Sequence, residues 1–95
     1  MHDTYHPEPR VILQHFPDGA VLYMPSNETY LGLNETGARI WGLLPKDGIG
    51  FEPLLREVAA VYPGVPVDDL RADLTLWLDE VLTFGLVRRE SAVAA

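Results

Sequence analysis

Three short runs rich in apolar residues occupy the first third of the chain, and a turn-forming segment separates each run from the next. The runs cover residues 11–16, 20–25 and 28–33, with Pro-Asp-Gly and Ser-Asn between them. These residue types favour tight reversals, and tight reversals between strands form hairpins. The pattern therefore predicts an antiparallel meander in chain order, with the third strand at an edge of the sheet.

Helical spacing of apolar residues follows the third strand. Asn34 suits the N-cap of a first helix whose apolar face extends to Leu44. A second helix is predicted over about residues 51–62. A third is predicted from Asp68, as its cap, to Gly85, which can take the left-handed C-cap conformation.

The two ends of the chain carry weaker patterns. Residues 1–10 are polar and contain two prolines, so we expect a flexible arm. Residues 86–89 are expected to form a short extended piece, and residues 91–95 a tail. No repeat is visible, and the length suits one domain over residues 1–95.

The third helix combines a clear apolar face with one residue that breaks it. At 100° per residue, one face holds Leu70, Leu74, Trp77, Leu78 and Val81. Leu76 projects to the side, between Asp73 and Glu80. A lone exposed leucine is ordinary, but one beside a tryptophan and rimmed by two acids suggests a contact surface. We assign Trp41, Leu33, Leu74 and Leu78 to the core.

The charge balance bears on the choice of partner. The chain has 14 acidic and 7 basic residues, a formal net charge of −7, and its basic residues are scattered. A nucleic-acid-binding protein normally shows a basic stripe. An acidic surface repels phosphate and favours a basic peptide or protein, so we expect no nucleic-acid partner.

Cysteine usage and hydropathy bear on the compartment. The chain has no cysteine, which fits a reducing cytosol and excludes a disulfide framework. No apolar run approaches the ~20 residues that span a bilayer, and the first ten residues lack a signal-peptide pattern. We therefore expect a cytoplasmic protein without a membrane partner.

Histidine and serine offer little chemistry. His2, His6 and His15 have no carboxylate at metal-ligand spacing, so we expect solvated histidines. Ser26 and Ser91 lack a nucleophile context, and a triad would need His15 and a distant acid.

Glycine and aspartate candidates also have simpler explanations. Gly48 and Gly50 follow a helix rather than a strand, which excludes a phosphate-binding loop. Asp68 and Asp69 suit the cap and the dipole of a helix better than a catalytic carboxylate pair. The sequence therefore predicts no enzyme activity, no cofactor and no metal.

The third strand carries the most informative feature. Exposed sheet edges are normally blunted by charge, proline or a bulge, and residues 29–33 contain none of these. Gly32 permits close approach of another backbone. An open edge beside a helix suits the capture of a peptide as an added strand, while a plain structural edge remains the alternative.

The strand-to-helix junction resembles the PqqD-like family, the leader-peptide recognition domains of ribosomally made peptide natural products. The family pattern is a hairpin, then aromatic-x-Gly-Leu-Asn-x-Thr-Gly, then an apolar helix with a tryptophan. The matching residues are Tyr30, Gly32, Leu33, Asn34, Thr36, Gly37, Ile40 and Trp41. The likeness covers about residues 10–90; the junction motif is fairly specific and the helical half is generic.

This resemblance implies an α+β, winged-helix-like domain, with a three-stranded antiparallel sheet followed by three helices. Family members bind the leader of a precursor peptide as a fourth strand, with side chains entering the cleft against the third helix. The implied function is non-catalytic: to hold the leader, as a RiPP recognition element, and present the core peptide to a partner enzyme.

The sequence leaves several alternatives for the partner and the function. The chain looks most like the discrete leader-binding proteins of lasso-peptide pathways, where a cysteine protease removes the leader before a cyclase acts. The peptide chaperone of the quinone-cofactor pathway, which serves a radical S-adenosylmethionine enzyme, is an alternative. A winged-helix DNA-binding regulator and a subunit that only stabilises a larger enzyme are others.

The expected peptide site combines strand and helix. Its strand residues are Glu28, Thr29, Tyr30, Leu31 and Gly32, whose backbone would bond to the leader. Its helix residues are Leu76 and Trp77 as an apolar floor, and Asp69, Asp73 and Glu80 as partners for basic leader residues.

Overall fold

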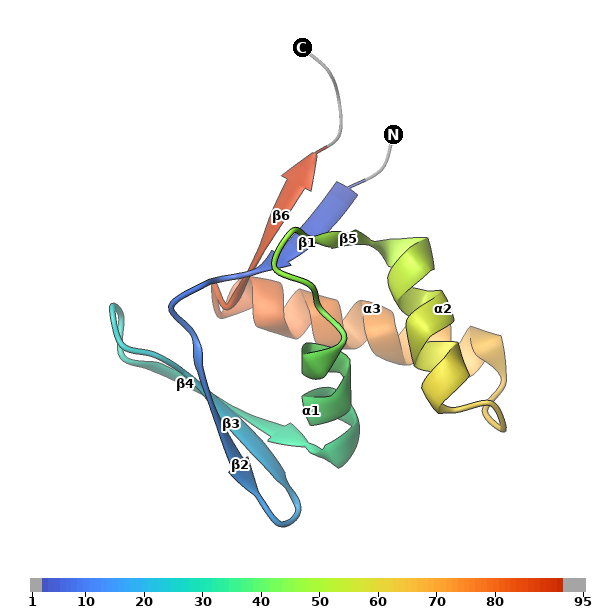
Figure 1. The fold of residues 1–95 in the computed structure, drawn as a ribbon, viewed down its shortest axis with the longest axis horizontal. Helices are drawn as coiled ribbons and strands as arrows, with labels where there is room; N and C mark the ends of the chain where they lie inside the picture. Colours follow the sequence, from blue (N-terminus) through green and yellow to red (C-terminus); the bar gives the residue numbers. More distant parts are fainter. Residues whose placement is uncertain (1–2, 92–95) are drawn as a thin grey trace.

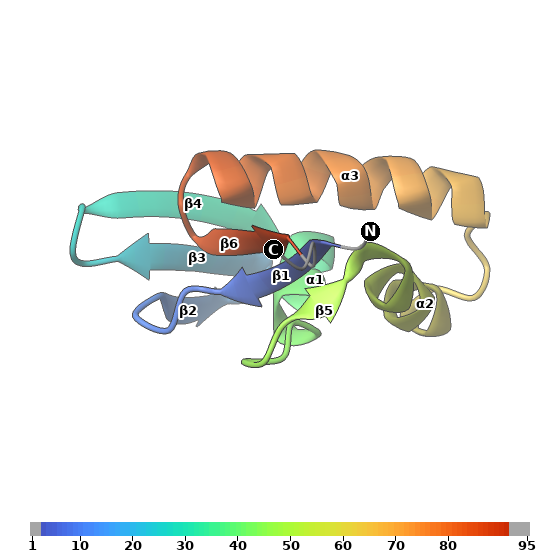
Figure 2. The same ribbon diagram turned by 90° about the horizontal axis from the view of Figure 1, so that it is seen from above.

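A computed structural model describes residues 3–91 of the 95-residue chain, which fold into two small antiparallel sheets and three helices (Figure 1). The elements are β1 (Asp3–Pro7), β2 (Ile12–Phe16), β3 (Gly19–Met24), β4 (Thr29–Asn34), α1 (Glu35–Gly42), β5 (Ile49–Gly50), α2 (Phe51–Val61), α3 (Val67–Thr83) and β6 (Val87–Ser91). α3 runs along one side of the molecule, and the strands, α1 and α2 lie on the other (Figure 2). This is the predicted α+β class.

The first sheet is the predicted meander, in the order β2-β3-β4. Side chains alternate along β3, so that Ala20, Leu22 and Met24 are buried while the residues between them are half-exposed. Opposite them on β4, Leu31 and Leu33 are buried. Within residues 3–91, β4 pairs with β3 alone, and it therefore forms the predicted edge.

The second sheet, in the order β5-β1-β6, corrects the prediction of a flexible arm over residues 1–10. Residues 3–7 form β1 and pair with all five residues of β6. The partner lies at the far end of the chain, so no local pattern announces the pairing. Ser91, assigned to a tail, ends β6, and residues 1–2 and 92–95 lie outside the described part of the chain.

The N-cap residue predicted for α1 is confirmed, and the one predicted for α3 is wrong. Asn34 caps α1 as predicted, because its Oδ1 accepts a hydrogen bond from the Gly37 N–H at 2.8 Å. α3 starts directly after Pro66, so the prediction that Asp68 is its cap is wrong. Proline presets the backbone angle at that point, and Asp68 lies with Asp69 in the first turn, near the positive end of the helix dipole.

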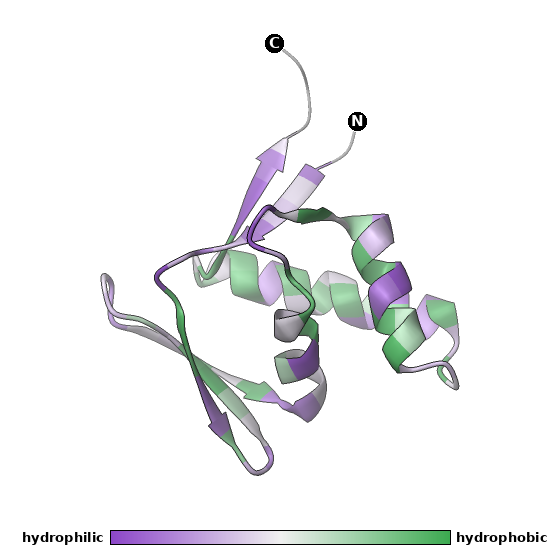
Figure 3. Ribbon diagram, viewed as in Figure 1, coloured by the Kyte–Doolittle hydropathy of each residue, from purple (hydrophilic) through white to green (hydrophobic). Residues whose placement is uncertain are grey.

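One hydrophobic core joins the first sheet, the three helices and the start of β6. The predicted face of α3 is buried throughout: Leu70, Leu74, Trp77, Leu78 and Val81. Leu33 is buried as predicted, whereas Trp41 is only half-buried and packs against the core from its side. In Figure 3, β6 is largely hydrophilic and α3 carries hydrophobic stretches along its length.

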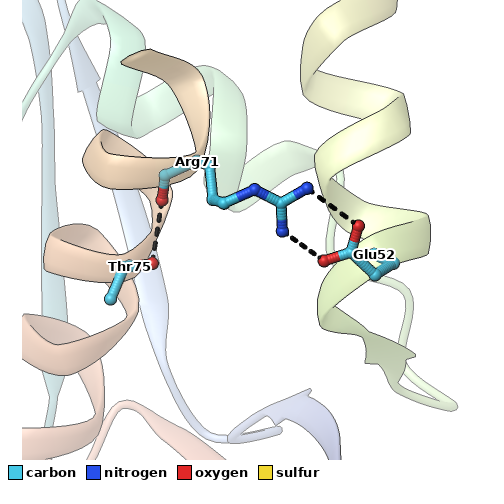
Figure 4. Close-up of polar contacts among 3 residues, drawn as sticks. All are labelled: Glu52, Arg71 and Thr75. Carbon is cyan, nitrogen blue, oxygen red and sulfur yellow. Dashed lines mark hydrogen bonds and ion pairs between the residues drawn. The ribbon is translucent and has the colours of Figure 1, made fainter. Parts of the chain in front are cut away.

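An ion pair joins α3 to the start of α2. The Arg71 guanidinium donates two hydrogen bonds to the Glu52 carboxylate at the start of α2, and it lowers the pKa of that carboxyl group (Figure 4). The Thr75 hydroxyl donates to the Arg71 carbonyl at 2.8 Å. Both members of the pair are about half-exposed, so the pair adds little to the stability of the fold.

Candidate functional site

The edge strand β4 presents different groups to the core and to solvent. Leu31 and Leu33 point into the core, whereas the Tyr30 side chain is 63% exposed and Gly32 is exposed. Tyr30 stacks on Tyr23 of β3 with ring centroids 4.4 Å apart, and partial burial followed by the effect of Tyr30 raises the pKa of Tyr23. The solvent face of the sheet is therefore aromatic next to the open edge.

The direction of the β4 backbone follows from the close approach of Gly19. A Cβ on Gly19 would lie 2.1 Å from the Leu33 carbonyl oxygen, so that oxygen points toward β3. In an antiparallel sheet the backbone groups of successive residues point alternately to the two sides of a strand. The N–H and C=O of Leu33 and Leu31 therefore face β3, and those of Tyr30 and Gly32 face the open edge.

Two further observations define the usable length of this edge. Glu28 has a positive φ of 53°, so the regular strand begins after it, and the Thr29 N–H donates to Asn27 Oδ1 at 3.1 Å in the preceding turn. At Gly32 a Cβ would meet no atom within 4 Å. The fold itself does not require glycine there, and its absence of a side chain leaves the edge open to another backbone.

A cavity of about 320 Å³ lies where β4 ends, between the start of α1 and the middle of α3. It is lined by Asn34, Thr36, Gly37, Ile40, Asp73, Leu76 and Trp77. The end of the open edge thus adjoins a pocket whose lining is polar and apolar in about equal parts.

The Trp77 ring forms one wall of this cavity and also belongs to the core. Its side chain is nine-tenths buried, and a Cβ on Gly37 would lie 3.1 Å from its Nε1. The missing side chain of Gly37 therefore lets α1 and α3 approach each other at this point.

The exposed face of α3 carries acidic residues, of which Asp73 lines the cavity. Leu76 is 69% exposed, which confirms that it points away from the core. Asp69, Asp73 and Glu80 are exposed at helical spacing with it, and none of the three forms an ion pair with another residue in 3–91. This face is free to meet a basic partner.

The structure unites some predicted site residues and separates others. Asp73, Leu76 and Trp77 line one cavity, whereas Asp69 and Glu80 lie elsewhere on α3 and do not line it. The backbone groups of Thr29 and Leu31 face β3, and Glu28 precedes the strand. Tyr30 and Gly32 are therefore the open backbone positions among the predicted strand residues.

The sequence reasoning missed the wall contributed by α1: Thr36, Gly37 and Ile40. The available signal was their position directly after the edge strand, with a glycine on an otherwise apolar helix face.

Two other cavities of the described chain lie apart from the predicted site residues. A larger cavity of about 650 Å³ lies between β1, β5 and the start of α2, and none of the predicted site residues lines it. Residues 3–91 hold no group of three or more potential metal ligands. Among the helices described, none has the length and hydropathy to cross a membrane.

Comparison with solved structures supports the assignment of the fold. The solved structure of "TbiB1 in Complex with the TbiA(beta) Leader Peptide" superposes on this chain with a TM-score of 0.72 at 27% sequence identity. The match covers 95% of this chain and 99% of that one. The match thus takes in both sheets and all three helices. No curated protein sequence matches this chain.

A comparison with protein families agrees with the resemblance seen at the strand-to-helix junction. Residues 19–87 match the family described as Coenzyme PQQ synthesis protein D (PqqD), and this span contains β3, β4, all three helices and the cavity. The junction residues that carry the resemblance, from Tyr30 to Trp41, lie within it. This chain belongs to the PqqD family.

Proposed function

We propose that this protein captures the leader segment of a ribosomally made precursor peptide as an added strand on β4. The observation that carries the proposal is the open edge at Tyr30 and Gly32, which leads into the cavity against α3. The TbiB1 structure, a complex with a leader peptide, supports it.

Strand addition divides the work between backbone and side chains. Backbone hydrogen bonds to Tyr30 and Gly32 would give affinity for any extended peptide. Alternate side chains of the added strand would lie on the aromatic solvent face or turn toward α3. Specificity therefore resides in the cavity, where Leu76 and the Trp77 ring offer apolar contact.

The acids on α3 would adjust affinity rather than provide most of it. Asp69, Asp73 and Glu80 are exposed, and ion pairs in such positions are weakened by water and salt. Basic leader residues beside α3 would therefore speed association and add a mild salt dependence.

We infer a non-catalytic role in which the bound leader is presented to a processing enzyme in the cytoplasm. The leader peptidase of a lasso-peptide pathway, a cysteine protease, is the first candidate, because the junction motif around Tyr30 to Trp41 resembles the discrete leader-binding proteins of such pathways. A radical S-adenosylmethionine enzyme served by a PqqD-type chaperone is the second, supported by the family description.

A titration distinguishes this function from that of a DNA-binding regulator. The leader of the precursor encoded beside this protein's gene is expected to bind with a 1:1 stoichiometry in calorimetry. Duplex DNA is expected not to bind even at low salt, where phosphate contacts are strongest, because the chain carries a net charge of −7. Tight duplex binding without leader binding would contradict the proposal.

A further inference from the structure

The indole N–H of Trp77 is buried without a hydrogen-bond partner among residues 3–91. Buried tryptophan N–H groups normally find an acceptor, because an unpaired buried donor loses its bonds to water. Trp77 also lines the cavity beside α1.

The N–H edge of the ring faces the α1 wall of the cavity. A Cβ on Gly37 would lie 3.1 Å from Trp77 Nε1 and 3.3 Å from Asn34 Oδ1. Asn34 Oδ1 already accepts the Gly37 N–H as the cap of α1. The donor therefore lies at the junction of three residues that line the same cavity.

We propose that Trp77 is a specificity-determining residue, whose N–H donates a hydrogen bond to a neutral hydroxyl or carboxamide side chain of the leader. This inference rests on the proposed function and names the chemistry read in its cavity. The Trp77 nitrogen is covered in the free protein where it approaches Gly37 and Asn34, so peptide entry has to open this contact between α3 and the start of α1.

The other groups that line the cavity determine which chemical class of leader side chain fits beside Trp77. Asp73 also lines it, so an acidic leader side chain would meet a like charge. A lysine or arginine side chain offers no acceptor, and an apolar side chain would leave the indole unpaired. A hydroxyl or carboxamide can accept from Trp77 and donate to Asp73, while its carbon atoms contact Ile40 and Leu76.

Trp77→Phe removes the donor and keeps most of the aromatic surface. Leader affinity is expected to fall about tenfold, the usual consequence of losing one buried hydrogen bond to a ligand. Thermal stability of the free protein should not fall in proportion, because the lost donor has no partner there. Trp41→Phe is the matched control: Trp41 is half-buried, does not line the cavity, and should leave affinity unchanged.

Two measurements with the leader of the neighbouring precursor test the hydrogen bond directly. The chain has two tryptophans, so a ¹⁵N-labelled sample gives two indole signals. At saturation the Trp77 signal should move downfield while the Trp41 signal stays. Alanine substitution of each hydroxyl and carboxamide residue of the leader should reveal one that weakens binding to the wild type but not to Trp77→Phe.

A leader that saturates the protein without moving the Trp77 signal, or without any coupled residue, would overturn this inference and leave the proposed function intact. Absence of leader binding to the wild type would instead overturn the proposed function itself.

Discussion

Leu74→Glu is expected to unfold the domain, whereas Leu76→Glu, two residues further along α3, is expected to leave it folded. Leu74 is fully buried at 0% exposure, and the substitution would place an unpaired carboxylate in the core. The combined loss of packing and burial of charge should cost more than about 4 kcal/mol. That is a large part of a stability on the order of 5–15 kcal/mol.

Leu76→Glu separates binding from folding. Leu76 is 69% exposed, so its replacement should change the free energy of unfolding by less than about 0.5 kcal/mol. It should nevertheless weaken leader binding about tenfold or more, because it removes an apolar wall of the cavity and adds a carboxylate beside Asp73. Circular-dichroism melting and calorimetric titration measure the two effects. If Leu76→Glu melts as low as Leu74→Glu, Leu76 belongs to the core and this assignment is wrong.

Gly32→Pro is expected to abolish leader binding in a protein that still folds. Proline lacks the N–H that Gly32 directs to the open edge, but no hydrogen bond to β3 depends on that N–H. Gly32→Ala is the matched control, because it keeps the N–H and its Cβ meets no atom within 4 Å. Leu31→Pro should instead break the sheet, because the Leu31 N–H faces β3. Leader affinity of Gly32→Pro equal to that of the wild type would exclude an added strand at this position.

The part of the fold that sequence could predict is the part set by local signals. The meander, the edge position of β4 and the Asn34 cap each depend on residues within a few positions of one another. β1 depends on pairing with β6 at the other end of the chain, and no local pattern carries that information. Its polar composition instead resembled a flexible arm.

In the candidate site, too, the features set by local spacing could be predicted and those set by packing could not. The spacing of Leu76 against the apolar face of α3 indicated its exposure, because helical geometry alone decides it. The α1 wall and the buried Trp77 N–H depend on how closely two helices approach at Gly37, which only three-dimensional packing reveals. The direction of the β4 backbone likewise required the position of Gly19 against Leu33.

Residue-resolved amide exchange tests the central claim of an added strand most directly. The same alternation leaves Leu13 and His15 of β2 with outward backbone groups on the opposite edge of the sheet, where they serve as internal controls. On saturation with the leader, the amides of Tyr30 and Gly32 should become protected, while those of Leu13 and His15 stay unchanged. A bound leader that gives no new protection at Tyr30 and Gly32 would place the peptide on the helices alone and contradict the account.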